Sequence, residues 1–119
     1  MKSYKDLKVY LLSYEKAKEM YNVASKLPKD EMYGLTSQVK RAATSIPLNI
    51  AEGYGKGTGG KELQRFLQMA RGSCTEMNVL LDFLKDFKYI EENLHENHTK
   101  DYEEIGKMLT GLIKSITNN

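Results

Sequence analysis

The middle of the chain, residues 41–76, reads RAATSIPLNIAEGYGKGTGGKELQRFLQMARGSCTE. Its centre, residues 53–60, is rich in glycine, and on both sides apolar residues recur at steps of three and four, the period of an amphipathic helix. Two such helices joined by a short flexible segment should pack as an antiparallel hairpin. The residues expected to face inward are Met32, Leu35, Val39, Ala42, Ile46 and Ile50 on the first of these two helices, and Leu63, Leu67, Ala70, Cys74, Met77, Leu81 and Leu84 on the second. We expect the first of them to continue across Pro47 and to be kinked there, because proline removes one backbone donor.

Polar residues on the two sides of this hairpin follow the same spacing. Opposed residues in an antiparallel hairpin have numbers with a nearly constant sum, and four polar pairs each add up to 117. The pairs are Arg41 with Glu76, Ser45 with Gly72, Asn49 with Gln68, and Glu52 with Arg65. We name these eight residues the polar seam. They predict buried or half-buried ion pairs that fix the register of the two helices, and a close approach of the helices at Gly72.

Outside the hairpin the chain has the pattern of two further helices. One runs from Leu7 to Leu27, just before Pro28, and the other follows the polar stretch 91–99. The inward residues of the latter should be Tyr102, Ile105, Leu109, Leu112 and Ile116. Asp30 is the expected N-cap of the second helix, and the third should begin within residues 58–61. The sequence therefore predicts one domain, residues 1–119, with an all-α fold: an antiparallel up-down-up-down four-helix bundle whose second helix is kinked at Pro47.

Apolar residues form more than one row on the first and third helices. The residues expected to face the core on the first helix are Leu7, Tyr10, Tyr14, Ala17, Tyr21 and Ala24. The alternative for the tyrosines, which are interleaved with lysines, is that they stack on nucleic-acid bases. A second row on that helix contains Val9, Met20, Val23 and Leu27, and a second row on the third helix contains Phe66, Leu80, Phe83 and Phe87. These rows are either parts of a wide core stripe or a protein interface.

Composition and charge place the chain among globular proteins. Its 119 residues are 40% hydrophobic and 29% charged, and no apolar run is long enough to span a membrane. The start of the chain lacks the apolar stretch of a secretory signal, so we expect a cytoplasmic protein without membrane contact. The net charge of +2 is unevenly distributed: residues 1–61 hold 11 Lys and Arg against 6 Asp and Glu, and residues 62–119 hold 7 against 10.

Two segments resemble motifs that bind nucleotides or metals, but neither has the further residues that such a site requires. The glycine segment resembles a phosphate-binding loop, but Glu62 follows Lys61 where a serine or threonine would ligate magnesium. His95 and His98 lie in a polar stretch with a single Glu-x-x-His motif, so we expect solvated loop histidines rather than a di-iron site. We therefore expect no enzyme activity, no catalytic residue, no metal and no cofactor.

Four cations outside the polar seam are the candidates for contact with nucleic-acid phosphates. Lys40 should point away from the inward stripe of its helix, Lys56 and Lys61 flank the glycine segment, and Arg71 lies on a polar row of the third helix. Arg41 and Arg65 are assigned to the polar seam instead. A charge distribution that only keeps the protein soluble explains the same residues, so the charges alone do not distinguish nucleic-acid binding from solubility.

Two motifs resemble the ribosomal-RNA intervening-sequence protein family. They are LPKxExYGLxxQxxRAAxSIPxNIAEG at residues 27–53 and FLxxAxGSxxE at residues 66–76. The resemblance implies a four-helix bundle, often a homopentamer, encoded in bacteria and commonly labelled a ribosomal protein. The accessory protein of diversity-generating retroelements resembles the same fold, and it partners a reverse transcriptase and nucleic acid.

Residues and resemblance together predict a non-enzymatic, oligomeric four-helix-bundle protein that could bind RNA or DNA through phosphate contacts. A pentamer of chains with +2 each would total about +10, a modest charge for that purpose. The alternative is a structural adaptor that docks a protein partner such as a reverse transcriptase. The salt dependence of binding distinguishes these two functions, because phosphate contacts weaken steeply as the salt concentration rises and apolar contacts do not.

Overall fold

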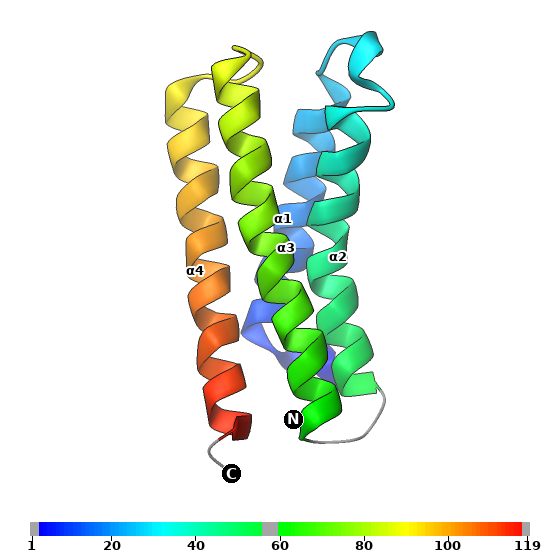
Figure 1. The fold of residues 1–119 in the computed structure, drawn as a ribbon, viewed down its shortest axis with the longest axis vertical. Coiled ribbons are helices and arrows are strands. Elements are labelled where there is room, and N and C mark those ends of the chain that lie inside the picture. The colour runs from blue at the N-terminus through cyan, green and yellow to red at the C-terminus, as the bar shows by residue number, and fades with distance from the viewer. Residues whose placement is uncertain (1–2, 56–59, 118–119) are drawn as a thin grey trace.

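Four α-helices make up the body of the molecule. The computed structural model describes residues 3–55 and 60–117, and in this part of the chain all regular structure is helical. The helices are α1 (Lys8–Ser25), α2 (Leu35–Gly55), α3 (Lys61–Asp86) and α4 (Glu92–Thr117), with short 3₁₀ turns at Tyr4–Asp6 and Lys29–Glu31. They lie side by side along the 45 Å long axis (Figure 1). The predicted all-α helical bundle is confirmed.

Successive helices run in opposite directions. In Figure 1 the chain, followed from blue to red, runs upward in α1 and α3 and downward in α2 and α4. α2 packs most extensively against α3, α3 also packs against α4, and α1 packs against α2 but only lightly against α4. The α1–α4 joint is therefore the loosest of the four, and the groove between these two helices reaches buried polar side chains.

The start of α2 differs from the expectation. Asp30 is not its N-cap, because residues 29–31 form a 3₁₀ turn and the helix begins at Leu35. The Glu31 carboxylate lies at this end of α2, 3.4 Å from the backbone nitrogen of Leu35, and it accepts a 2.8 Å hydrogen bond from the Tyr89 hydroxyl. A negative charge at a helix N-terminus is favourable, so Glu31 takes the role predicted for Asp30.

The start of α4 also differs, because the polar stretch 91–99 is helical and not a loop. α4 begins at Glu92, and the backbone N–H of His95 donates to the carbonyl of Glu91 at 3.0 Å. Lys88 has a positive φ of 64°, which turns the chain between α3 and α4. The loop was predicted from the polar composition of this stretch. The stretch is helical, and it contacts α1 through the buried His98.

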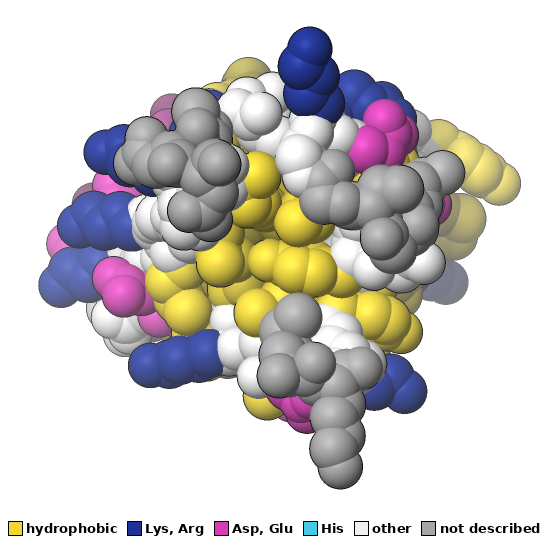
Figure 2. Space-filling model, turned by 90° about the horizontal axis from the view of Figure 1, so that it is seen from below, with side chains coloured by type: hydrophobic (Ala, Val, Ile, Leu, Met, Phe, Trp, Pro, Cys, Tyr) yellow, Lys and Arg dark blue, Asp and Glu magenta, His cyan; other side chains and the backbone are white. Residues whose placement is uncertain are grey.

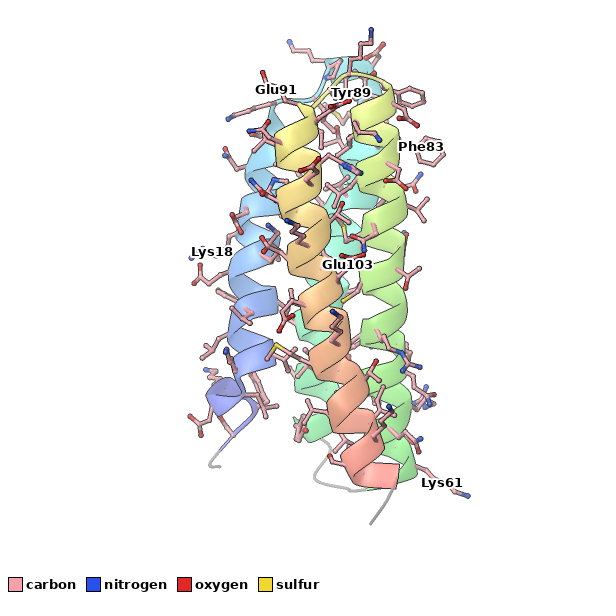
Figure 3. The ribbon with its side chains drawn as sticks, turned by 90° about the vertical axis from the view of Figure 1, so that its left-hand side faces the viewer. Lys18, Lys61, Phe83, Tyr89, Glu91 and Glu103 are labelled. Carbon is pink, nitrogen blue, oxygen red and sulfur yellow. The ribbon has the colours of Figure 1, made fainter. Side chains whose placement is uncertain are left out.

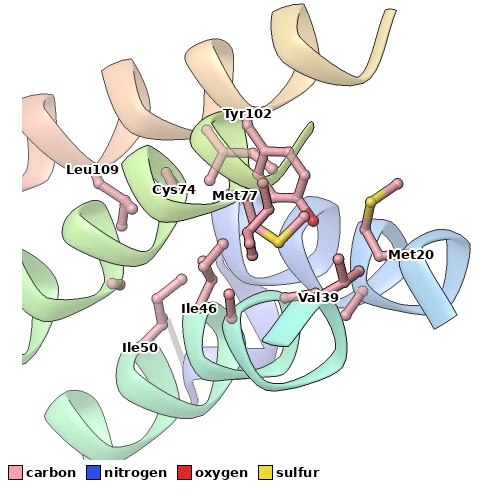
Figure 4. Close-up of a cluster of buried hydrophobic side chains, with 14 of the residues drawn as sticks. Met20, Val39, Ile46, Ile50, Cys74, Met77, Tyr102 and Leu109 are labelled. Atoms are coloured by element: carbon pink, nitrogen blue, oxygen red, sulfur yellow. The ribbon is translucent and has the colours of Figure 1, made fainter. Parts of the chain in front are cut away.

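The core holds the predicted stripes of α2, α3 and α4. Figure 4 shows its centre, where side chains from all four helices meet. Every residue predicted inward on α3 is buried. On α4, Tyr102, Ile105 and Leu109 of the predicted stripe are buried, and Leu112 and Ile116 are half-buried. Met32, predicted to begin the stripe of the second helix, lies before α2 and is exposed, whereas the rest of that stripe is buried. α2 is continuous through the buried Pro47, as predicted, and the kink there stays a prediction.

The core face of α1 is rotated from the one predicted. Val9 and Met20 of the second row are buried, and so are Ala17 and Ala24 of the predicted stripe, whereas Tyr14 and Tyr21 are 48% and 44% exposed. The second apolar row therefore faces the bundle, and the tyrosine row lies on the outside beside α2. Both rows have helical period, so periodicity alone did not fix which one turns inward. No helix in the described residues is apolar over a length that would cross a bilayer.

Candidate functional site

The candidate phosphate-binding cations do not form one patch on the chain. Lys40 lies over the ring of Tyr21, with its Nζ 5.1 Å from the ring centroid, at the α1–α2 side. Arg71 turns to α4 and donates to the Thr110 hydroxyl at 3.3 Å. Lys61 begins α3 at the other end of the bundle (Figure 3), roughly 20 Å along the axis from Lys40. Lys56 lies outside the described residues.

That end of the bundle is apolar at its centre. Among the side chains drawn in Figure 2, hydrophobic groups fill the middle, and Lys, Arg, Asp and Glu lie around the edge. The glycine segment considered for phosphate binding connects α2 and α3 here, and residues 56–59 lie outside the described residues. Gly60, with a φ of 72°, is the N-cap of α3 and supplies no side-chain hydrogen bond.

The polar seam forms at one of its ends. Arg41 of α2 donates to the Glu76 carboxylate of α3, which is the pairing and register predicted. The two side chains are 60% and 36% exposed, so the pair lies at the surface and is not buried. One turn further along α2, Ser45 faces α3 as expected, but the side chain it meets there is Ser73, whose hydroxyl lies 2.6 Å from that of Ser45, and not the predicted Gly72.

The other half of the polar seam does not pair across the helices. The Asn49 amide donates to the carbonyl of Ser45 on its own helix at 2.8 Å, in place of the expected contact with Gln68. Arg65 pairs with Glu62 within α3 at 2.7 Å, in place of Glu52. A partner one turn away on the same helix is closer than one across the joint, so these two predicted pairs were wrong.

Gly53, and not Gly72, marks the close approach of α2 and α3. A Cβ placed on Gly53 would lie 2.9 Å from Cδ1 of Leu63 and 3.0 Å from Cβ of Phe66, so only glycine fits there. Gly72 is exposed, and a Cβ there would meet no atom of the described chain within 4 Å. The prediction for Gly72 was wrong because its position on the helix faces outward.

A polar cluster around the buried Lys16, between α1 and α4, was not predicted. Lys16 is 4% exposed, and its Nζ lies 2.6 Å from Nδ1 of His98 and 2.6 Å from Oδ2 of Asp101. Glu19 adds a carboxylate at 3.5 Å. Burial, and then the Lys16 charge, lower the pKa of His98. The interpretation of His98 as a solvated loop residue was wrong.

A signal for this cluster was present in the sequence. Ser13 and Lys16 fill the helical positions between Val9 and Met20, so they continue the row that turned out to face the bundle. The other histidine, His95, is also helical and contacts Asp82 of α3 at 2.7 Å. Within the described residues no group of three His, Cys, Asp or Glu side chains is arranged to hold a metal ion.

An aromatic groove lies between α1 and α2 on the outside of the bundle. Its volume is about 530 Å³, and we name it the tyrosine groove. The described residues that line it are Tyr4, Tyr10, Tyr14, Ala17, Lys18, Tyr21, Thr44, Pro47, Leu48 and Ala51. The tyrosines that were expected in the core thus line a groove that is open to solvent.

A second exposed apolar feature lies on α3, and we name it the phenylalanine row. It consists of Val79, Phe83 and Phe87, each about half exposed and one turn apart. The rings of Phe83 and Phe87 are 5.8 Å apart, and Phe83 points away from the bundle (Figure 3). In contrast, Cys74 is buried, and burial raises the pKa of its thiol to about 12, so it is a core residue and not a nucleophile.

The structure is an all-α helical bundle. Its exposed features are the Arg41–Glu76 ion pair, the tyrosine groove and the phenylalanine row. Residues 5–111 match the family described as 23S rRNA-intervening sequence protein, and the chain belongs to this family. The fold is also similar to a solved structure of a protein of unknown function from the S23 ribosomal protein family of Bacteroides thetaiotaomicron. The two share 27% identity with a TM-score of 0.79, over 89% of this chain and 95% of that one. No curated protein matches the sequence.

Proposed function

We propose that the protein is a non-enzymatic, cytoplasmic scaffold that assembles into a homo-oligomer, with five copies as the expected number, and that the assembled form binds RNA or DNA through phosphates. The observation that carries this proposal is the amount of apolar side chain left exposed on a small chain. Among the described residues twelve large hydrophobic side chains are exposed, including the phenylalanine row and Leu48. Exposed apolar rows of this kind are typical of surfaces that associate with another protein.

The phenylalanine row is the surface that best suits self-association. Phe83 and Phe87 carry no polar group, and contacts between aromatic rings from two chains would remove them from water. Closed symmetric assembly is the usual outcome when a chain carries such a surface. Repetition around an axis would also multiply the cations that are scattered on one chain.

Nucleic acid as the ligand is supported by charge distribution and by the names of the relatives. The excess of cations lies in residues 1–61, which include α1 and α2. Both the family description and the similar solved structure carry ribosomal names. Binding of this kind would be tolerant of sequence, because scattered lysines contact phosphates and not base edges.

A titration of labelled RNA at two salt concentrations tests the proposal, with sedimentation on the same samples. We expect an oligomer, and we expect binding whose log-log salt slope falls by about 0.7 for each phosphate contact removed from single strands. The variant Lys56→Glu with Lys61→Glu should bind more weakly and with a shallower slope. A monomer with no binding at low salt would contradict both parts of the proposal.

A protein adaptor is the second candidate, favoured by an acidic groove between α1 and α4. Glu15, Glu19, Asp101 and Glu104 line this groove, and Lys16 is the only cation among the described residues that do so. Such a groove would repel nucleic acid and attract a basic protein surface, for example that of a polymerase. Binding that is unchanged in the Lys56→Glu, Lys61→Glu variant would favour this candidate.

A further inference from the structure

The tyrosine groove has features that a phosphate-binding patch does not need. Four tyrosine rings line it, and no acidic side chain is among the described residues that do so. Tyr14 and Tyr21 are nearly half exposed, although an apolar ring in water is unfavourable. A ligand that covers these rings would therefore gain free energy from contact with them.

The rings are arranged as a platform along α1. Tyr10 and Tyr14 are one helical turn apart, with centroids 5.9 Å apart and planes inclined by 29°. Tyr4 meets the edge of Tyr10 at 4.9 Å, which fixes one end of the row. Tyr21 continues the row two turns beyond Tyr14 on the same face of the helix. Flat rings repeated on one face suit flat ligands that also repeat.

Lysines accompany these rings. The Nζ of Lys18 lies 5.8 Å from the centroid of Tyr14, and the Nζ of Lys40 lies 5.1 Å from that of Tyr21. Lys18 also pairs with Glu15 at 3.1 Å, but both side chains are mostly exposed, so this pair is weak. Each exposed ring thus has a cation beside it that can turn to an anionic group of the ligand.

We propose that the tyrosine groove binds single-stranded nucleic acid by stacking bases on Tyr14 and Tyr21, with phosphates at Lys18 and Lys40. Stacking on aromatic side chains beside cations is how proteins hold single strands without reading their sequence. A protein segment could also cover tyrosines, but Lys18 in the lining, Lys40 beside Tyr21 and the lack of an acidic side chain among the described lining residues favour a polyanion. This inference rests on the proposed function and assigns its ligand class and contact residues.

The test compares two probes that differ only in their bases. One is a labelled oligouridylate of about 12 nucleotides, and the other is an abasic strand of the same length and charge. We expect the unaltered protein to bind the oligouridylate at least about tenfold more tightly than the abasic strand. The variant Tyr14→Leu with Tyr21→Leu should lose this difference while it keeps the binding of the abasic strand.

Two further variants serve as controls. Tyr14→Phe with Tyr21→Phe keeps the rings, so it should bind the oligouridylate as the unaltered protein does. Tyr33→Leu removes a tyrosine that is 94% exposed and lies before α2, away from the groove, and it should also leave binding unchanged. Helix content and thermal midpoint, measured for each variant, show that the fold is kept.

The outcomes separate the inference from the function on which it rests. Equal binding of the two probes by the unaltered protein overturns stacking but leaves phosphate binding in place. No binding of either probe at low salt overturns both. If Tyr14→Leu with Tyr21→Leu lowers the mass of the oligomer in sedimentation, the groove is an interface between copies of the chain, and the inference is wrong.

Discussion

The α2–α3 joint and the α1–α4 joint use charge in opposite ways. Between α2 and α3, Arg41 meets Glu76 at the surface, where water competes for both groups. Between α1 and α4, Lys16 is withdrawn from water and held by His98 and Asp101. An exposed ion pair contributes about 0–1 kcal/mol, whereas removing one member of a buried cluster has a much larger effect. The ion pair that is visible in the sequence is therefore the weaker one.

Truncation of Lys16 should have the largest effect of the changes considered. Lys16→Ala removes a buried side chain and leaves His98 without this partner, so we expect a loss of about 2–4 kcal/mol in the free energy of unfolding. Lys16→Met is the matched variant, because it keeps the apolar stem and removes only the charge, so it should retain a loss of about 1–3 kcal/mol. Urea denaturation measures both. A loss near zero for Lys16→Met would show that the packing, and not the charge, matters, and would contradict the comparison of the two joints.

Gly53 of the α2–α3 joint and the outward-facing Gly72 should respond differently to the same substitution. Gly53→Leu forces a side chain against Leu63 and Phe66 and should destabilise the fold by about 1–3 kcal/mol. Gly72→Leu meets open space and replaces a poor helix former, so it should be neutral or stabilise by up to about 1 kcal/mol. Thermal midpoints of both variants check this. A destabilised Gly72→Leu would restore the close approach first predicted there.

The α1–α4 joint should also be sensitive to pH. Burial lowers the pKa of His98 below its usual 6.5, so the unfolded chain takes up a proton more readily than the folded one. Folding stability contributed by this residue is thus complete above about pH 6.5 and falls as the pH drops toward the folded pKa, by at most about 1.4 kcal/mol per pH unit. Denaturation at pH 7.5 and pH 5.5, which bracket about pH 6.5, should show this loss in the unaltered protein and a smaller one in His98→Gln. An identical loss in both would assign the pH dependence to other groups.

Loss of Arg41 should have the smallest effect. A buried or half-buried pair, as the sequence predicted, would make Arg41→Ala strongly destabilising, but the exposed position of the pair predicts a loss below about 1 kcal/mol. The effect should shrink further in high salt, since exposed charges are screened. Denaturation of the variant at low and high salt measures it. A loss as large as that of Lys16→Ala would erase the contrast between the two joints.

The sequence alone determined the helical class, the stripes of α2, α3 and α4, and the Arg41–Glu76 register. These depend on spacing within a helix or on the geometry of one short hairpin, which residue numbers describe directly. The residues of the family signature were visible at the same stage. The polar seam was predicted correctly only where no partner on the same helix was closer.

Tertiary structure alone decided which face of α1 turns inward and which polar groups meet across α1 and α4. Tyr14 and Val9 belong to two rows with the same helical period, so only the neighbours of α1 could choose between them. Lys16 could be buried because His98 and Asp101, more than 80 residues later, lie opposite it. Contacts between residues so far apart follow from how the helices pack. For that reason the tyrosine groove and the buried lysine became visible only in the folded chain.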